Sequence, residues 1–169
     1  MTPAVFSPCR RYRYVLEREV QAPTLFSTQG PPAFAVFVCL NPSTADEVIE
    51  DATIRKVKAF ALRWGHTHVR MLNMYAWRST DPEGLWKTED PVGPENDKHL
   101  LAGTKDARIV ICAWGKNAKP ERERAVVRML REAGRTLFAL ARNDDLTPSH
   151  PLYLPAASKP LPYDGERAP

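Results

Sequence analysis

One uncharged stretch followed by a polar loop constrains the fold of this sequence more than any other feature. Residues 34–40 (FAVFVCL) carry no charge, which is typical of a strand buried on both faces, as in a parallel sheet. The chain then breaks at Asn41-Pro42 into a loop dense in side-chain oxygens, among them Ser43, Thr44 and Asp46. Ligands bind at the carboxyl ends of strands in open α/β sheets. We therefore expect this loop to form the floor of an active site.

Helix and strand patterns alternate along the rest of the chain. Asp51 suits the N-cap of a helix that ends near Gly65, and Pro120 suits the first turn of another that reaches about residue 133. Further strands are predicted at 11–19, 68–73, 108–113 and 136–141, a short helix at 95–102, loops at 21–32 and 142–153, and a long connection at 74–96. This alternation predicts a three-layer α/β/α sandwich with a central, mostly parallel sheet.

The length and charge of the chain set broad limits on its class. A chain of 169 residues has the size of one domain with a substantial core. We assign residues 1–154 to a single α/β domain and residues 155–169 to a proline-rich tail that drapes over the surface or is mobile. A net charge of +4 and a pI near 9.1 permit a nucleic-acid or nucleotide partner, although scattered surface arginines account for them equally well.

The cysteines and the apolar segments indicate where the protein resides. Cys9, Cys39 and Cys112 stand far apart with no CxxC pair, and an odd number without a secretory leader argues against a disulfide framework. No segment is long and apolar enough to span a bilayer. We expect a cytoplasmic protein without a membrane partner.

Four polar signatures follow the four predicted core strands. Asn41 follows the first, Asn73 the second, Trp114-Gly115 the third and His150-Pro151 the fourth. In a parallel sheet with helices on both faces, the carboxyl ends of the strands lie along one edge. The signatures are therefore predicted to converge there.

Three residue types in the predicted loops at this edge suit catalysis. Asn41 can orient a water molecule or bind a ligand amide, although an Asn-Pro pair also commonly closes a turn. Asp46 and Asp51 are candidates for a general base or a metal ligand. Helix capping is the alternative role for Asp51, so Asp46 is the better catalytic candidate of the two. His150 is the best acid/base or hydrogen-bonding candidate because its pKa lies nearest neutrality.

Other polar and aromatic side chains near the same edge suit substrate binding. Aromatic faces beside asparagines suit a flat heterocycle such as a nucleobase, and packing over the sheet edge is their alternative role. The binding candidates are Ser43, Thr44, Asn73, Tyr75, Arg78 and Tyr153. The sequence has no GxGxxG and no GxxxxGK[ST] motif, so neither a dinucleotide cofactor nor a P-loop is indicated.

The motifs of the chain resemble those of a bacterial family of small proteins of unknown function. The likeness extends over nearly the whole length. The motifs that carry it are LNPSTAD (40–46), DATIR (51–55), LNMYAWRSTDP (72–82), PVGPEND (91–97), AWG (113–115) and HPLYL (150–154).

More distantly, the order of the signatures is similar to that of the uracil-DNA glycosylase superfamily. That resemblance implies a uracil-DNA glycosylase-like fold, with Asn41 positioning water, Asn73 reading the base and His150 steadying the departing base. Leu152 and Tyr153 would press into the DNA groove. The sequence departs from the superfamily at Cys39, where a glycine is expected, and the acids between residues 43 and 53 have no counterpart there.

The leading hypothesis is a glycosylase-like hydrolase that cleaves the N-glycosidic bond of a nucleobase in DNA or a nucleotide, as in DNA repair, without a cofactor or metal. One alternative is a metal-assisted hydrolase or transferase on a nucleotide-like molecule, acting through Asp46 and Asp51. The other is a nucleic-acid-binding module without catalytic activity, which predicts salt-dependent binding without turnover.

Overall fold

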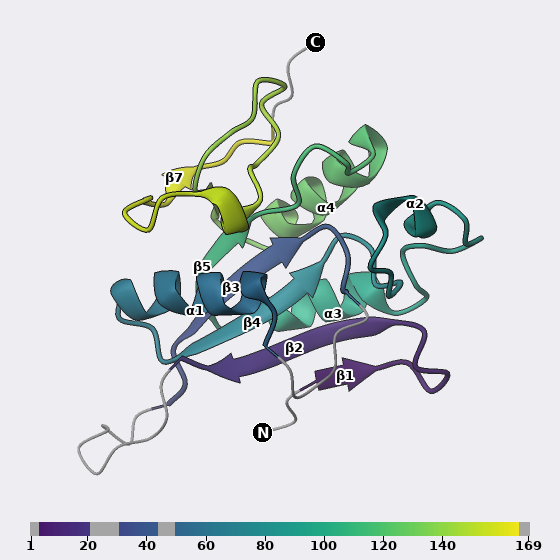
Figure 1. Cartoon of the computed structure of the whole chain (residues 1–169), viewed down its shortest axis with the longest axis horizontal. Coiled ribbons are helices and arrows are strands. Elements are labelled where there is room, and N and C mark those ends of the chain that lie inside the picture. Colours follow the sequence, from purple (N-terminus) through teal and green to yellow (C-terminus); the bar gives the residue numbers. More distant parts are fainter. Residues whose placement is uncertain (1–3, 21–30, 44–49, 166–169) are drawn as a thin grey trace.

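The computed structural model of the chain describes residues 4–20, 31–43 and 50–165 (Figure 1). The predicted loop at 21–32 therefore lies mostly outside the described residues. Within them, no helix has the length and apolar character needed to cross a membrane.

The described residues form one seven-stranded sheet with the order β1-β2-β4-β3-β5-β6-β7. The strands are β1 (Ala4–Phe6), β2 (Arg13–Glu19), β3 (Phe34–Cys39), β4 (His68–Asn73), β5 (Ala107–Cys112), β6 (Leu137–Ala139) and β7 (Leu161–Pro162). The four central strands, β4, β3, β5 and β6, run parallel, while β1, β2 and β7 pair antiparallel at the two sides. The expected parallel sheet is thus confirmed for the centre, and its antiparallel margins are wider than predicted.

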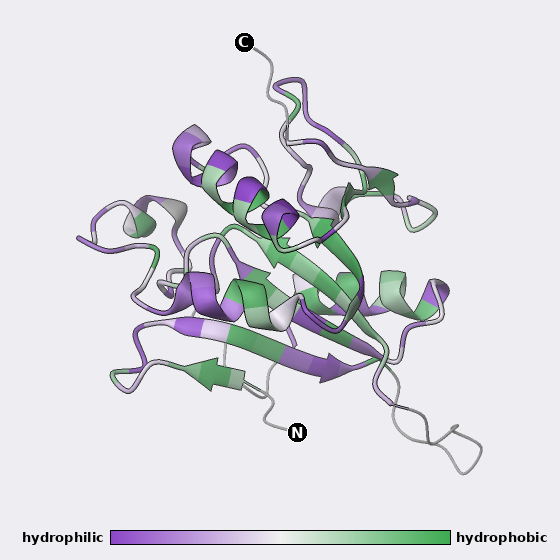
Figure 2. Ribbon diagram, turned by 180° about the vertical axis from the view of Figure 1, so that it is seen from behind, coloured by the Kyte–Doolittle hydropathy of each residue, from purple (hydrophilic) through white to green (hydrophobic). Residues whose placement is uncertain are grey.

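Helices cover both faces of this sheet (Figures 1 and 2). On one face lies α1 (Ala52–Arg63), and on the other lie α3 (Asn96–Gly103) and α4 (Pro120–Glu132). The long connection after β4 contains the one-turn helix α2 (Pro82–Leu85), and a 3-10 turn, η1, spans Pro151–Tyr153. A mixed α/β architecture with a central sheet is therefore confirmed.

The central strand β3 separates two halves of the hydrophobic core. Every residue of β3 is buried, because neighbours on both edges and helices on both faces enclose it. Successive side chains point to opposite faces, so Phe37 packs with the α1 side and Val36 and Val38 pack with the α3–α4 side. The alternation of strand side chains is what makes an uncharged heptapeptide necessary at this position.

Residues 155–165 belong to the folded structure, which corrects the expected draping or mobile tail for this part of it. Strand β7 pairs with β6, and Tyr163 is 2% exposed. The Tyr163 hydroxyl donates a hydrogen bond to Glu123 Oε1 of α4 at 2.5 Å, and its ring packs edge-on against Trp114. A two-residue strand and one buried aromatic are too short a signal for sequence periodicity to reveal.

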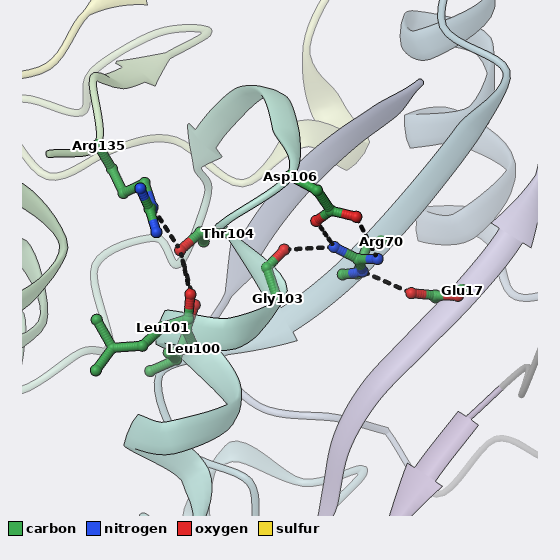
Figure 3. A network of polar contacts seen from close by, with 8 residues as sticks. All are labelled: Glu17, Arg70, Leu100, Leu101, Gly103, Thr104, Asp106 and Arg135. Atoms are coloured by element: carbon green, nitrogen blue, oxygen red, sulfur yellow. Dashed lines mark hydrogen bonds and ion pairs between the residues drawn. The ribbon is translucent and has the colours of Figure 1, made fainter. Parts of the chain in front are cut away.

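A buried arginine connects strands β2 and β4 with the segment that leads from α3 to β5 (Figure 3). Arg70 of β4 donates hydrogen bonds to Glu17 Oε1 of β2 at 2.6 Å and to Asp106 Oδ1 before β5 at 2.5 Å. It also donates to the Gly103 carbonyl at 2.7 Å and stacks over the Phe34 ring, with 3.9 Å between the guanidinium carbon and the ring centroid. Phe34 opens β3, so this network stabilises the sheet away from the carboxyl end of that strand.

Candidate functional site

The order of the parallel strands creates a crevice at the carboxyl end of β3. From β3 the chain passes through α1 to β4 on one side, and it later reaches β5 on the other side of β3. The connections that leave neighbouring strands β3 and β5 therefore diverge, which is the topological switch point where α/β sheets bind ligands.

Two adjoining cavities occupy this position. The large lobe, of about 560 Å³, is lined by residues 39–41 after β3, residues 114–117 after β5 and the chain around His150. The small lobe, of about 190 Å³, is lined by the carboxyl ends of β3 and β4, the start of α1 and residue Arg13 of β2. Cys39, Asn41 and His150 line both lobes. The polar signatures that follow β3, β4 and β5 and the predicted loop after β6 thus converge, as expected.

Asn41 has a fixed side-chain orientation. Its Nδ2 donates to the Ser79 carbonyl at 2.9 Å and to the Pro42 carbonyl at 3.2 Å. Because both partners are acceptors, the end of the carboxamide that faces them must be the nitrogen, and the oxygen Oδ1 points the other way. Asn41 therefore offers Oδ1 to the lobes as a hydrogen-bond acceptor. Its nitrogen closes the Asn-Pro turn, which is the alternative role that the sequence suggested.

His150 has a fixed tautomer. Its Nδ1 accepts a hydrogen bond from the Leu152 amide at 3.3 Å, at the start of η1. A neutral ring that accepts at Nδ1 carries its proton on Nε2. Burial lowers the pKa of His150, and the Asp51 carboxylate opposes that shift. At neutral pH His150 is thus a neutral donor.

Asn73 is 3% exposed and lines the small lobe. Its backbone carbonyl accepts a hydrogen bond from Asn96 Nδ2 at 3.0 Å. In the described part of the chain, no hydrogen bond involves its carboxamide. A carboxamide that lines a cavity and has no protein partner can both donate to and accept from a ligand, so this side chain has the character of a ligand-binding group.

The position of Asp51 is compatible with both of its predicted roles, which are helix capping and a catalytic or ligand-binding role in the cleft. Its Oδ1 accepts from the Ile54 amide at 2.8 Å, which confirms the helix cap, and Oδ2 accepts from Ser43 Oγ at 3.4 Å. Both Asp51 and Ser43 line the small lobe. Among the described residues, Asp51 is the one carboxylate that lines either lobe.

Arg13 is a lining residue that sequence reasoning missed. It opens β2, is 6% exposed and lines the small lobe. Burial lowers the pKa of Arg13 to about 10, helped by nearby Arg78 and opposed by Asp51, so the side chain stays charged at neutral pH. The available signal was an arginine directly before the apolar run YVL, inside the strand predicted at 11–19.

Of the two tyrosines predicted to bind substrate, one lines the cleft and the other does not. Tyr153 is 86% exposed and lines the large lobe. Tyr75 lines neither lobe: it is buried, its hydroxyl accepts from the Lys119 amide at 3.1 Å, and its ring packs edge-on against Trp86. Tyr75 therefore has the packing role that was the alternative to substrate binding.

Arg78 does not line either lobe. Its guanidinium donates to the Arg10 carbonyl at 3.2 Å and lies over the Phe6 ring. It contributes positive potential near Arg13. Thr44 and Asp46 lie outside the described residues.

Two further groups limit the chemistry of the cleft. Burial raises the pKa of the Cys39 thiol to about 12, so the thiol is protonated at neutral pH and is a poor nucleophile. Across residues 4–20, 31–43 and 50–165, no three His, Cys, Asp or Glu side chains form a group that could hold a metal ion. The metal-assisted alternative depends on both Asp46 and Asp51, and Asp46 lies outside the described residues.

The loop that presents His150 is held by its own hydrogen bonds. Ser149 Oγ donates to Asn143 Oδ1 at 3.1 Å, and Asn143 Nδ2 donates to Thr147 Oγ1 at 2.9 Å. The Gly115 amide donates to the Pro148 carbonyl at 2.9 Å, which joins the loops after β5 and β6. His150 is therefore positioned by a rigid frame, as a catalytic or ligand-binding histidine requires.

The fold and the cleft together define an α/β protein with a polar, two-lobed pocket at the switch point of its sheet. The chain belongs to the family described as protein of unknown function (DUF1643), whose model matches residues 13–152. That span begins at Arg13 and includes Asn41, Asn73 and His150. It confirms the expected membership of a family of unknown function. No curated protein and no solved structure matches the chain.

Proposed function

We propose that the two-lobed cleft binds a nucleobase and hydrolyses its N-glycosidic bond, in DNA or a nucleotide. The observation that carries this proposal is the buried carboxamide of Asn73, which has no hydrogen-bond partner in the described part of the chain and lines the small lobe. An amide that both donates and accepts matches the edge of a base. Asn41 and His150 line the junction of the two lobes, where the bond to the sugar would lie.

Each side chain has a hydrogen-bonding direction that fits one part of this reaction. Asn41 Oδ1 accepts a hydrogen bond from water and directs its oxygen lone pair toward the anomeric carbon. As the carbon–oxygen bond forms, the carbon–nitrogen bond breaks and the base departs with its electron pair. The His150 Nε2–H donates to the base as this negative charge develops, and a donor fixed in advance stabilises such charge most effectively.

Asp51 can receive the proton that the attacking water loses. Its carboxylate lines the small lobe beside Ser43, and its charge reaches His150. Asp46 was the preferred acid of the pair from sequence. It lies outside the described residues, so the base role is assigned to Asp51 in this proposal.

The mouth of the large lobe fits a base presented by nucleic acid. Tyr153 is exposed beside it, and Lys116 is exposed on the opposite loop. An enzyme that acts on a base in a duplex extrudes it into a pocket. An exposed aromatic ring can stack in the space that the base leaves, and a lysine can meet the phosphate backbone.

The proposal is tested with oligonucleotides that each contain one uracil, hypoxanthine, xanthine or alkylated base, in single and double strands. Base release is read as strand cleavage after alkali. The informative variant is Asn73→Ala, because no structural hydrogen bond of the side chain is lost. We expect it to keep the stability of the wild type and lose base release. Thr136→Ala, at the opposite end of the sheet, is the control.

Three outcomes separate the candidate functions. Release by wild type and not by Asn73→Ala supports glycosidic hydrolysis. Salt-dependent binding of oligonucleotides without release from any lesion indicates the binding module and refutes the proposal. Turnover of a nucleotide that requires added Mg²⁺ or Mn²⁺ indicates the metal-assisted alternative.

A further inference from the structure

A third cavity adjoins the small lobe along the chain, and we call it the aromatic pocket. Its volume is about 430 Å³, which is within the range of small-molecule sites. Its residues come from the connection between β1 and β2 and from the connection after β4, and they include Arg11, Tyr12, Trp77, Lys87, Thr88 and Glu89. The hydrolysis proposed above uses none of them.

Two aromatic rings form a wall of this pocket. Tyr12 and Trp77 are both half-buried, and their rings meet edge to face with 5.4 Å between the centroids. The Tyr12 hydroxyl donates a hydrogen bond to the Asp90 carbonyl at 3.0 Å, so Tyr12 is anchored across the pocket. An aromatic wall suits a flat heterocycle, because every nucleobase can stack on such a ring.

The polar side chains of the pocket are available to a ligand. Across residues 4–20, 31–43 and 50–165, no side-chain hydrogen bond or ion pair involves Arg11, Trp77, Lys87 or Thr88. The indole Nε1–H of Trp77 donates, and the Thr88 hydroxyl both donates and accepts. These groups match the mixed donors and acceptors on the edge of a base.

The charges of the pocket suit a neutral ring with an anionic backbone outside it. Arg11 and Lys87 are exposed, and so are Glu89 and Asp90. The two cations and the two carboxylates leave the lining without a net charge. The exposed cations can meet the phosphates of a strand, while the aromatic wall receives the base.

A short stretch of chain joins the aromatic pocket to the small lobe. Trp77 lines the pocket, and Ser79 lines the small lobe. Two residues span at most about 7 Å, so the two cavities are neighbours. The Trp77 amide donates to the Pro91 carbonyl at 3.1 Å and the Ser79 amide donates to the Pro42 carbonyl at 3.0 Å, which fixes this stretch. A ligand with two successive bases therefore fits two cavities held side by side.

Building on the proposed function, we infer that the aromatic pocket binds the base next to the target base on the same nucleic-acid strand. Enzymes that act on extruded bases use contacts to flanking nucleotides to choose their substrates. The inference narrows the substrate from a base in DNA or a nucleotide to a base within a strand. Trp77 stacks on the neighbouring base, and Thr88 contacts its edge.

The test compares two fluorescein-labelled single strands by anisotropy, without any turnover. One strand carries five thymines, and the other carries only the central thymine, with abasic sites at the other four positions. Both strands have the same phosphates, so the electrostatic part of the binding is the same. Free thymidine monophosphate is the third probe.

Trp77→Leu should weaken binding of the five-base strand by about 5- to 150-fold, the effect of losing one base–aromatic stack. The one-base strand should bind this variant as it binds wild type. Trp77→Phe keeps a ring and should retain most of the affinity. Trp86→Leu is the matched control, because Trp86 is also half-buried and lines neither the pocket nor the lobes.

Thr88→Val keeps the inference testable if Trp77→Leu does not fold. It removes one hydroxyl at nearly constant volume and should weaken the five-base strand alone by about 2- to 12-fold, the effect of one hydrogen bond. Unfolding midpoints of every variant report any loss of structure.

The possible results have distinct meanings. Losses confined to the five-base strand in Trp77→Leu and Thr88→Val, and absent in Trp86→Leu, support the inference. Equal losses for both strands, no loss in either variant, or no binding of the five-base strand overturns it. Thymidine monophosphate that binds as tightly as the five-base strand, with the same dependence on Trp77, also overturns it, because the pocket then takes a free nucleotide. The base-release assay decides the proposed function separately, since these binding measurements require no release.

Discussion

Replacing Asn41 with aspartate exchanges one nitrogen for an oxygen and leaves the shape of the side chain almost unchanged. In the wild type this nitrogen donates to the carbonyl oxygens of Pro42 and Ser79 at 3.2 and 2.9 Å. In the Asn41→Asp variant, a carboxylate oxygen would face the same two carbonyl oxygens. The substitution therefore tests the orientation from which the water-binding role of Oδ1 follows.

The expected cost can be worked out from these two contacts. Each net hydrogen bond contributes about 0.5–1.5 kcal/mol, so their loss costs about 1–3 kcal/mol in the free energy of unfolding. Asn41→Ala loses the same two bonds without adding charge. Asn41→Asp should therefore be the less stable of the two at pH 7. A loss of 2 kcal/mol corresponds to about 4–8 °C in Tm for a chain of this size.

The pH dependence distinguishes the two variants. Facing two carbonyl oxygens raises the pKa of the introduced carboxyl group above its unfolded value of about 3.9. A raised native pKa means that the destabilisation is complete above that pKa and declines as the pH falls toward 3.9. The deficit of Asn41→Asp relative to wild type should thus shrink on acidification, whereas that of Asn41→Ala should stay constant.

Urea unfolding of the three proteins between pH 4 and pH 8 measures these differences. Equal stability of Asn41→Asp and wild type at pH 7, with no pH trend, would show that the carboxamide is oriented the other way. Oδ1 would then not face the lobes, and the proposed water-positioning role would fail with it.

Three further predictions concern stability and titration. Tyr163→Phe should lower the free energy of unfolding by about 1.5–3 kcal/mol, because the Glu123 carboxylate loses a buried donor; a loss below about 0.5 kcal/mol in urea unfolding would contradict this. Arg70→Met should cost about 3 kcal/mol by leaving Glu17 and Asp106 without their partner. The Arg70 hydrogen bond lowers the pKa of Asp106. In wild type this stabilisation is therefore present above about pH 3.9 and is lost as the pH falls through the lowered pKa. The stability of Arg70→Met should lack that dependence on pH. His150 should titrate below 6.5 with its proton on Nε2, and a ¹⁵N NMR titration that finds the proton on Nδ1 would refute the assigned tautomer.

The parallel centre of the sheet could be predicted from sequence because its signals are local. Strand β4 was predicted with its observed bounds, His68–Asn73, and α1 begins after its predicted cap Asp51. Periodicity and capping depend on residues a few positions apart, so they survive without tertiary information. The short strands β1 and β7 give no such signal and were missed.

The candidate site could be predicted in part. Asn41, Asn73 and His150 were placed on one edge because parallel strands end together, and the structure brings them to the same cleft. Tyr75 was assigned to substrate binding because it follows Asn73 by two residues. Spacing beyond the end of a strand does not determine where a side chain points, and Tyr75 packs into the core.

The sequence by itself therefore determined that this chain builds a parallel α/β core whose polar loops meet at one edge. Only the tertiary structure decided that Arg13 reaches that edge. Strand β2 runs antiparallel to β4, so its first residue lies beside the carboxyl end of β4, where the Arg13 amide donates to the Ala76 carbonyl at 2.9 Å. Pairing between strands more than fifty residues apart leaves no local pattern in the sequence, and it determines which charged side chain completes the cleft.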